Sequence, residues 1–146
     1  MGLDMAHDRR KAKGRREGGT YVPLPTFVLA SENFKSLSPR AKNLFLMMVT
    51  QLRFSVGGTN NNGDLAATHS IAKEWGFASK TTLKEAINEL LDRGWIELTR
   101  ETHFGDGRNM PNLYAMTLWA IDDCGGKLKV PPTKVASGKW KEWHAN

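Results

Sequence analysis

The sequence predicts an α+β fold in which helices dominate, and three observations lead to this prediction. Two helical patterns separated by three residues fill residues 68–93, and a serine–proline helix start lies upstream at Ser38. After Gly94 the hydrophobic period changes from helical to alternating. The length of 146 residues suits a single core with terminal extensions. We therefore expect a helical core followed by a small antiparallel sheet.

The paired patterns in residues 68–93 predict a helix-turn-helix, because the break at Gly76–Ala78 has room only for a tight turn. Ser79 stands where an N-cap is expected, and Gly94 stands where a helix commonly ends in a left-handed residue. In the second helix the apolar side chains recur every three or four residues, which predicts an inward face made of Leu83, Ile87, Leu90 and Leu91.

Upstream, Ser38–Pro39 should begin the central core helix, with serine as N-cap and proline at the first helical position. Residues 26–37 are expected to form short helical turns that cover the core. We interpret Gly57–Gly63 as a surface turn whose asparagines occupy positive-φ positions. The apolar face of the central helix should consist of Ala41, Leu44, Phe45, Met48 and Leu52, widened by Met47 and Val49.

After the second helix, two alternating segments predict a β-hairpin. Residues 95–99 should form a half-buried strand with Ile96 and Leu98 facing the core, and residues 113–118 alternate again. Residues 102–112, rich in glycine, would form the tip. A hairpin that directly follows a helix-turn-helix indicates a winged helix-turn-helix, mainly α, with a three-helix core, a two- to three-stranded antiparallel wing and basic tails.

Four stretches resemble the winged-helix domains of phage and plasmid replication initiators and related mobile-element DNA-binding proteins: LSPRAKNLFLMMVTQL, NNNGDLAAT, SKTTLKEAINELLDRGWIELTR and NLYAMTLWAIDDCGGKL. The resemblance covers residues 21–130 and implies a DNA-binding regulator or accessory replication factor of a prophage, plasmid or integrated element. Such initiators carry a helicase-recruiting region after the domain, and residues 120–146 are too few for one. We therefore expect a stand-alone DNA-binding protein with a disordered basic arm (1–20), a winged-helix domain (21–118) and a C-terminal extension (119–146).

The charge is concentrated in the tails. The net charge is +6 and the pI is about 9.6, which favours a polyanionic partner. Residues 1–20 hold six basic and three acidic side chains, residues 119–146 hold five and three, and residues 21–118 hold ten and nine. We expect the tails to supply much of the non-specific attraction for phosphate, although basic termini that only aid solubility would have the same composition.

The predicted DNA contacts come from the N-terminal half of the second helix, the wing and the arm. Asparagine can pair with adenine, glutamate with cytosine, and threonine can touch the thymine methyl group, whereas the acids Glu85, Glu89 and Asp92 oppose binding along the whole helix. The candidates on the helix are Ser79, Lys80, Thr81, Thr82, Lys84, Glu85 and Asn88. Those in the wing are Arg100, His103 and Arg108, and those in the arm are Arg9, Arg10, Lys11, Lys13, Arg15 and Arg16.

No motif predicts catalysis, a metal or a cofactor, because the four histidines are scattered and no glycine-rich phosphate loop is present. Without an apolar run long enough to span a membrane, we expect a cytoplasmic bacterial protein that is nucleoid-associated when bound. The partner is expected to be double-stranded DNA. A protein–protein adaptor anchored by Trp140 and Trp143, and single-strand or RNA binding by the tails, remain alternatives. The two tryptophans could equally belong to a terminal turn that docks on the protein's own core. The oligomeric state is open, a homodimer included.

Overall fold

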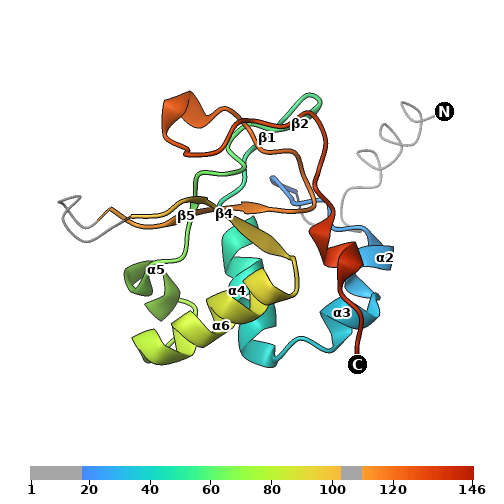
Figure 1. Ribbon diagram of the computed structural model, residues 1–146, viewed down its shortest axis with the longest axis vertical. Helices are drawn as coiled ribbons and strands as arrows, with labels where there is room; N and C mark the ends of the chain where they lie inside the picture. Colours follow the sequence, from blue (N-terminus) through green and yellow to red (C-terminus); the bar gives the residue numbers. More distant parts are fainter. Residues whose placement is uncertain (1–17, 103–109) are drawn as a thin grey trace.

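The computed structural model describes residues 18–102 and 110–146, and these form an α+β fold (Figure 1). The basic side chains of the predicted arm and the hairpin-tip residues His103 and Arg108 lie outside these ranges. The helices are α2 (Thr26–Leu29), α3 (Glu32–Lys35), α4 (Pro39–Val49), α5 (His69–Lys73) and α6 (Lys80–Asp92), with 3₁₀ turns η1 (Cys124–Gly126) and η2 (Lys139–Glu142). The strands are β1 (Phe54–Ser55), β2 (Gly58–Thr59), β3 (Leu65–Ala66), β4 (Ile96–Arg100) and β5 (Leu113–Met116).

Three helices begin where the sequence predicts, and each start has a side-chain cap. Ser38 Oγ accepts a hydrogen bond from the Ala41 amide at 3.1 Å, and Ser79 Oγ accepts one from the Thr82 amide at 3.1 Å. Thr68 caps α5 in the same way. These bonds satisfy amide groups that have no partner within the helix. The predicted starts of α4, α5 and α6 are therefore confirmed.

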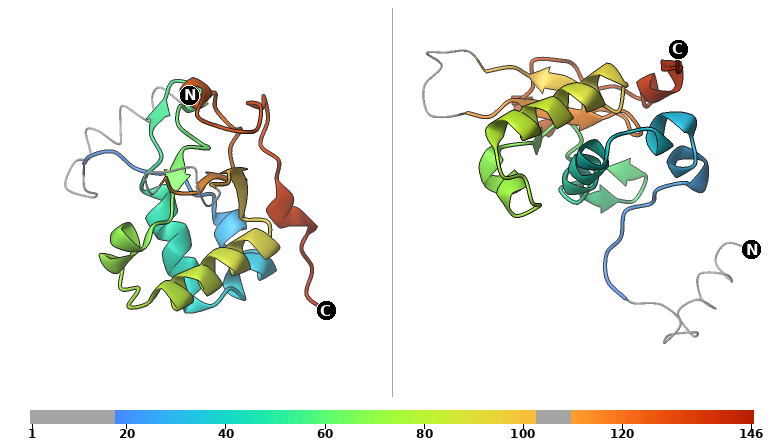
Figure 2. Two further views of the ribbon diagram at one scale, coloured as in Figure 1. Left: turned by 60° about the vertical axis from the view of Figure 1, so that its left-hand side comes forward. Right: turned by 90° about the horizontal axis from the view of Figure 1, so that it is seen from below.

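The main sheet has the strand order β3-β5-β4, with both pairs antiparallel. Helices α4 and α6 lie together on one side of this sheet (Figures 1 and 2). The core between the helices and the sheet contains large side chains that are fully buried, among them Leu44, Phe45, Met48, Leu90 and Trp95. The apolar faces that the sequence assigned to these two helices thus meet in one core.

The expected alternation in β5 is wrong, because all four of its residues are buried. β5 is the central strand of the sheet, and both of its faces are covered. Tyr114 and Met116 belong to the main core, while Leu113 and Ala115 are buried outside it. The segment that follows β5 turns back over the sheet (Figure 1). Within this segment, Ile121 is buried.

The expected inward face of β4 is also only partly right. Ile96 is buried, but Leu98 is 36% exposed and Thr99 is buried instead. The pairing with β5 shifts between Leu98 and Arg100, so the strand carries an irregularity that breaks the two-residue period. Thr99 Oγ1 donates to the Gly63 carbonyl at 2.6 Å, which satisfies its hydroxyl group in the interior.

The asparagine-rich segment is more than the surface turn that the sequence predicts. Asn62 is fully buried. The expectation that the asparagines occupy positive-φ positions is wrong, because Cys124 is the only non-glycine residue with a positive φ in the described ranges. The Asn62 Nδ2 group donates to the carbonyls of Met116, Trp119 and Ala120 at 2.9–3.1 Å, and its Oδ1 accepts from the Met116 amide at 2.8 Å. Asn62 therefore connects the loop before β3 to the chain that leaves β5.

The C-terminal extension packs against the core through Trp140, which is 7% exposed. Its ring stacks on Trp95 with 5.1 Å between centroids and 10° between planes. The Asn33 side chain donates to the carbonyls of Trp140 and Arg93, and its Oδ1 accepts from Trp95 Nε1. A Cβ atom on Gly94, whose φ is +80°, would lie 2.6 Å from the Lys139 carbonyl oxygen, so glycine also permits this close approach.

No helix in the described ranges is long and apolar enough to cross a membrane.

Candidate nucleic-acid interface

The outward side of α6 carries most of the predicted base-contacting residues. Leu83, Ala86 and Leu90 are buried on the inner side, while Ile87 and Leu91, predicted to be fully inward, lie half-buried on the flank. The beginning of α6 and the hairpin strands extend toward the same side of the molecule (Figure 1). The exposed candidates on the helix are Lys80, Thr81, Lys84, Glu85 and Asn88.

Two predicted contacts have hydroxyl groups that are already used inside the protein. Ser79 Oγ caps the helix, and it also lies 3.1 Å from Thr82 Oγ1. Thr82 Oγ1 donates to the Ser79 carbonyl at 3.0 Å. Both residues are half-buried. The hydrogen bonds between Ser79 and Thr82 fix the first turn of α6. This turn sets the direction of the exposed side chains that follow.

Glu89, one of the three acids that the sequence predicts to oppose DNA binding along α6, is bonded to α4. Its Oε2 accepts from the Ser38 amide at 2.8 Å, and its Oε1 accepts from Ser38 Oγ at 2.7 Å. The carboxylate therefore lies at the N-terminus of α4, where the helix dipole and free amide groups stabilise negative charge. This contact holds the Glu89 carboxylate against α4, and it joins α6 to α4.

Glu85 remains exposed, but it has a cationic neighbour on α4. Arg40 Nη2 lies 3.6 Å from Glu85 Oε2, and both side chains are about half exposed at 49% and 56%. An ion pair of this exposure contributes little to stability. Its effect is electrostatic, since it places a positive guanidinium group beside the acid at the edge of the outward face. Sequence reasoning missed Arg40, because the pair joins two helices and leaves no local pattern.

Arg100 is held at the end of β4, where the β4–β5 pairing ends. Its Nη2 donates to the Pro111 carbonyl at 2.8 Å, and the side chain is half-buried. One step further out, the Asn112 Oδ1 accepts from both the amide and the hydroxyl of Thr102 at 2.9 and 3.0 Å. These bonds tie the two strands together where they leave the sheet. Arg100 therefore has a structural partner, in addition to its predicted contact with DNA.

The groups that could serve catalysis are not brought together in the described part of the chain. Cys124 lies in η1 and His69 in the first turn of α5. Burial raises the pKa of the Cys124 thiol, and the nearby carboxylates of Asp64 and Asp122 raise it further, so the thiol is less reactive than a free one. The described residues also contain no group of three or more His, Cys, Asp or Glu side chains arranged to hold a metal ion.

Comparison of the chain with protein-family models, with curated proteins and with solved structures found no match.

Proposed function

We propose that the protein is a winged-helix protein that binds double-stranded DNA with the N-terminal half of α6. The order of the elements supports this proposal: α4 is followed by the small β1–β2 pair and then by β3, α5, α6, β4 and β5, with β3 and the β4–β5 hairpin in one sheet. The turn between α5 and α6 is fixed to the central helix, since Asn43 Nδ2 donates to the Trp75 carbonyl at 2.6 Å. A second helix presented rigidly in this way is the part of a helix-turn-helix that enters the major groove.

The observation that carries the proposal is the separation of roles along α6. Lys80, Thr81, Lys84 and Asn88 are exposed toward solvent, whereas Glu89 is bonded to Ser38 on α4. Lysine can donate to guanine, asparagine can pair with adenine, and the threonine methyl group can contact thymine. The exposed first half of the helix therefore offers donors and cations to a DNA groove, together with the Glu85 carboxylate, which can accept from cytosine.

The biological role that we propose is regulation or assistance of replication in a prophage, plasmid or integrated element. It rests on the resemblance of the four sequence stretches to replication initiators of such elements. The near balance of charge in residues 21–118 implies that basic residues of the tails contribute to affinity through phosphate contacts and release of counterions.

A selection of bound duplexes from a random pool, made with the full chain, tests this function. We expect an enriched motif, and we expect Asn88→Ala to relax the preference at one position by about 1–3 kcal/mol, the value of one good base contact. Asn60→Ala is the matched control, because Asn60 is an exposed asparagine in the loop that follows β2. No mobility shift on duplex DNA at low salt would contradict the proposal and leave the protein–protein adaptor.

A further inference from the structure

Two adjoining open cavities lie beside the extended segment that precedes α2, with volumes of about 410 and 810 Å³. Pro23 lines both of them. Phe27 and Trp119 line the first cavity, and Tyr21 and Phe54 line the second. Phe54 and Trp119 meet edge to face at 5.4 Å, so aromatic side chains continue from one cavity into the other. We name these four rings and the space along them the aromatic trough.

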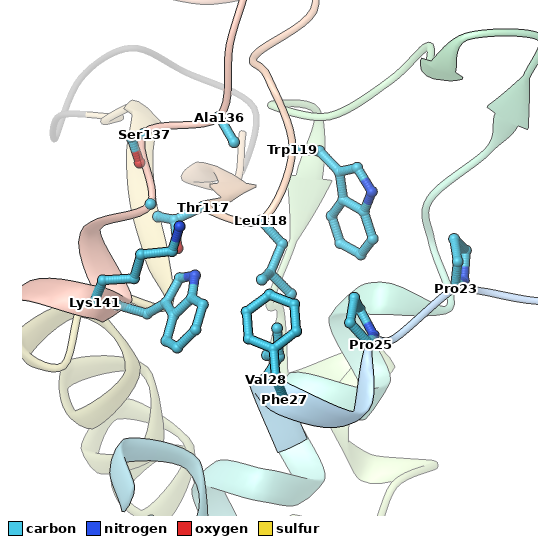
Figure 3. A pocket seen from close by; sticks show the side chains of 12 residues that line it. Pro23, Pro25, Phe27, Val28, Thr117, Leu118, Trp119, Ala136, Ser137 and Lys141 are labelled. Atoms are coloured by element: carbon cyan, nitrogen blue, oxygen red, sulfur yellow. The ribbon is translucent and has the colours of Figure 1, made fainter. Parts of the chain in front are cut away.

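The aromatic trough presents ring surface to solvent. Tyr21 is 74% exposed and Phe27 is 65% exposed, so both rings offer surface to a binding partner. Phe27 is held from beneath by Trp140, with 6.1 Å between ring centroids. Figure 3 shows Phe27 between Trp119 and Lys141. Phe27 is therefore supported by the protein, and both Tyr21 and Phe27 have exposed ring surface for contact.

The charges of the aromatic trough all have one sign. Arg53 lines one cavity and Lys141 lines the other, and no acidic residue is among the described residues that line either cavity. Both cationic side chains belong to exposed residues. A surface that combines cations with open aromatic rings complements a ligand that carries both negative charge and flat apolar groups.

We propose that the aromatic trough binds single-stranded nucleic acid. Phosphate groups would lie near Arg53 and Lys141, and unpaired bases would stack on Tyr21 and Phe27, as in proteins that bind single strands through aromatic platforms. A duplex does not fit this chemistry, because its bases are already stacked on one another. An acidic peptide would satisfy the cations, but it would leave the open ring faces without flat partners.

The aromatic trough and the outward face of α6 are separate surfaces. Seen from below, the extended segment that precedes α2 lies on the opposite side of α4 from α6 (Figure 2). One molecule can therefore hold a duplex on α6 and a single strand in the aromatic trough. The single-strand site does not depend on the proposed function of α6.

Fluorescence anisotropy with the full chain tests this proposal with three labelled probes at low salt. The first is oligo-dT of about twelve nucleotides, a length within the range that single-strand binders occupy. The second is an abasic deoxyribose-phosphate oligomer of equal length, and the third is a poly-glutamate peptide. We expect oligo-dT to bind at least about fivefold more tightly than the abasic oligomer, because stacking contributes beyond charge.

The variants separate stacking from folding. Phe27→Ala and Tyr21→Ala should each weaken oligo-dT binding about fivefold or more without changing abasic binding, whereas Tyr21→Phe should bind oligo-dT like the unaltered protein. Val56→Ala is the control, because Val56 is fully exposed and lines neither cavity. Thermal melts monitored by circular dichroism show whether each variant is folded. If Phe27→Ala is unstable, Tyr21→Ala still tests the proposal, because Tyr21 is largely exposed.

Three results would overturn the proposal: equal binding of oligo-dT and the abasic oligomer, no effect of either ring variant, or tighter binding of poly-glutamate, which would indicate an acidic protein partner. Asn88→Ala distinguishes this site from that of α6. It should alter duplex selection and leave oligo-dT binding unchanged, so either site can fail while the other stands.

Discussion

Replacing Asn62 with alanine should destabilise the protein strongly. The side chain is fully buried, and it serves four backbone groups: three carbonyls and the Met116 amide. Each buried polar group that loses its partner costs about 1–3 kcal/mol, and the shared donor makes the three carbonyl bonds less than additive. We therefore expect Asn62→Ala to lower the free energy of unfolding by about 3–5 kcal/mol.

Equilibrium unfolding in urea, followed by tryptophan fluorescence, measures this loss. Asn62→Asp separates donors from acceptors, because aspartate can still accept from the Met116 amide but cannot donate to the three carbonyls when ionised. It should be at least as damaging as alanine. Asn60→Ala, at an exposed position, should change stability by less than about 0.5 kcal/mol. A loss below about 1 kcal/mol for Asn62→Ala would refute the role that we assign to this residue.

Three further predictions concern α6 and its supports. Glu89→Ala should lower the free energy of unfolding by about 2–3 kcal/mol, because it removes two charge-assisted hydrogen bonds to Ser38. Urea unfolding measures this loss. An equal loss for Glu74→Ala, at an exposed position, would contradict the prediction. Trp140→Ala should lower the free energy of unfolding by about 3–5 kcal/mol, as for other buried aromatic rings. Calorimetry measures this loss, and an unchanged free energy of unfolding would mean that the C-terminal extension does not support the core. Lys84→Ala should reduce the salt slope of duplex binding by about one, and an unchanged slope in filter binding would remove it from the phosphate contacts.

The parts of the fold that were predictable from the sequence are those with local causes. A cap bonds to an amide three residues away, so Ser38, Thr68 and Ser79 mark helix starts wherever the rest of the chain lies. The inward residues of α4 and α6 follow from a helical period, which is also local. For the same reason the exposed candidates Lys80, Thr81 and Lys84 could be chosen before any tertiary contact was known.

The features that sequence reasoning missed depend on contacts between distant segments. Asparagine is a residue type typical of turns, and only the return of the chain after β5 gives the Asn62 side-chain amide its four backbone partners. The helical period places Glu89 on the polar side of α6, and its partner Ser38 lies 51 residues away in the sequence. The exposure of Leu98 follows from a register shift against β5. Arg100 could be chosen as a wing cation, but its bond to Pro111 could not.

The contacts at the two ends of α6 explain why its halves differ in their proposed roles. At the C-terminal end, Arg93 Nη1 donates to Ser36 Oγ at 2.7 Å, its guanidinium group lies 4.1 Å from the centroid of the Trp143 ring, and its carbonyl accepts from Asn33. One turn earlier, Glu89 is bonded to α4. The C-terminal half is thus enclosed by the core, α3 and the extension. The N-terminal half is held mainly through its inner side chains and its cap, so it is the half with donors and cations free to meet a ligand. A helix anchored at one end and exposed at the other presents fixed side chains with little loss of conformational entropy on binding.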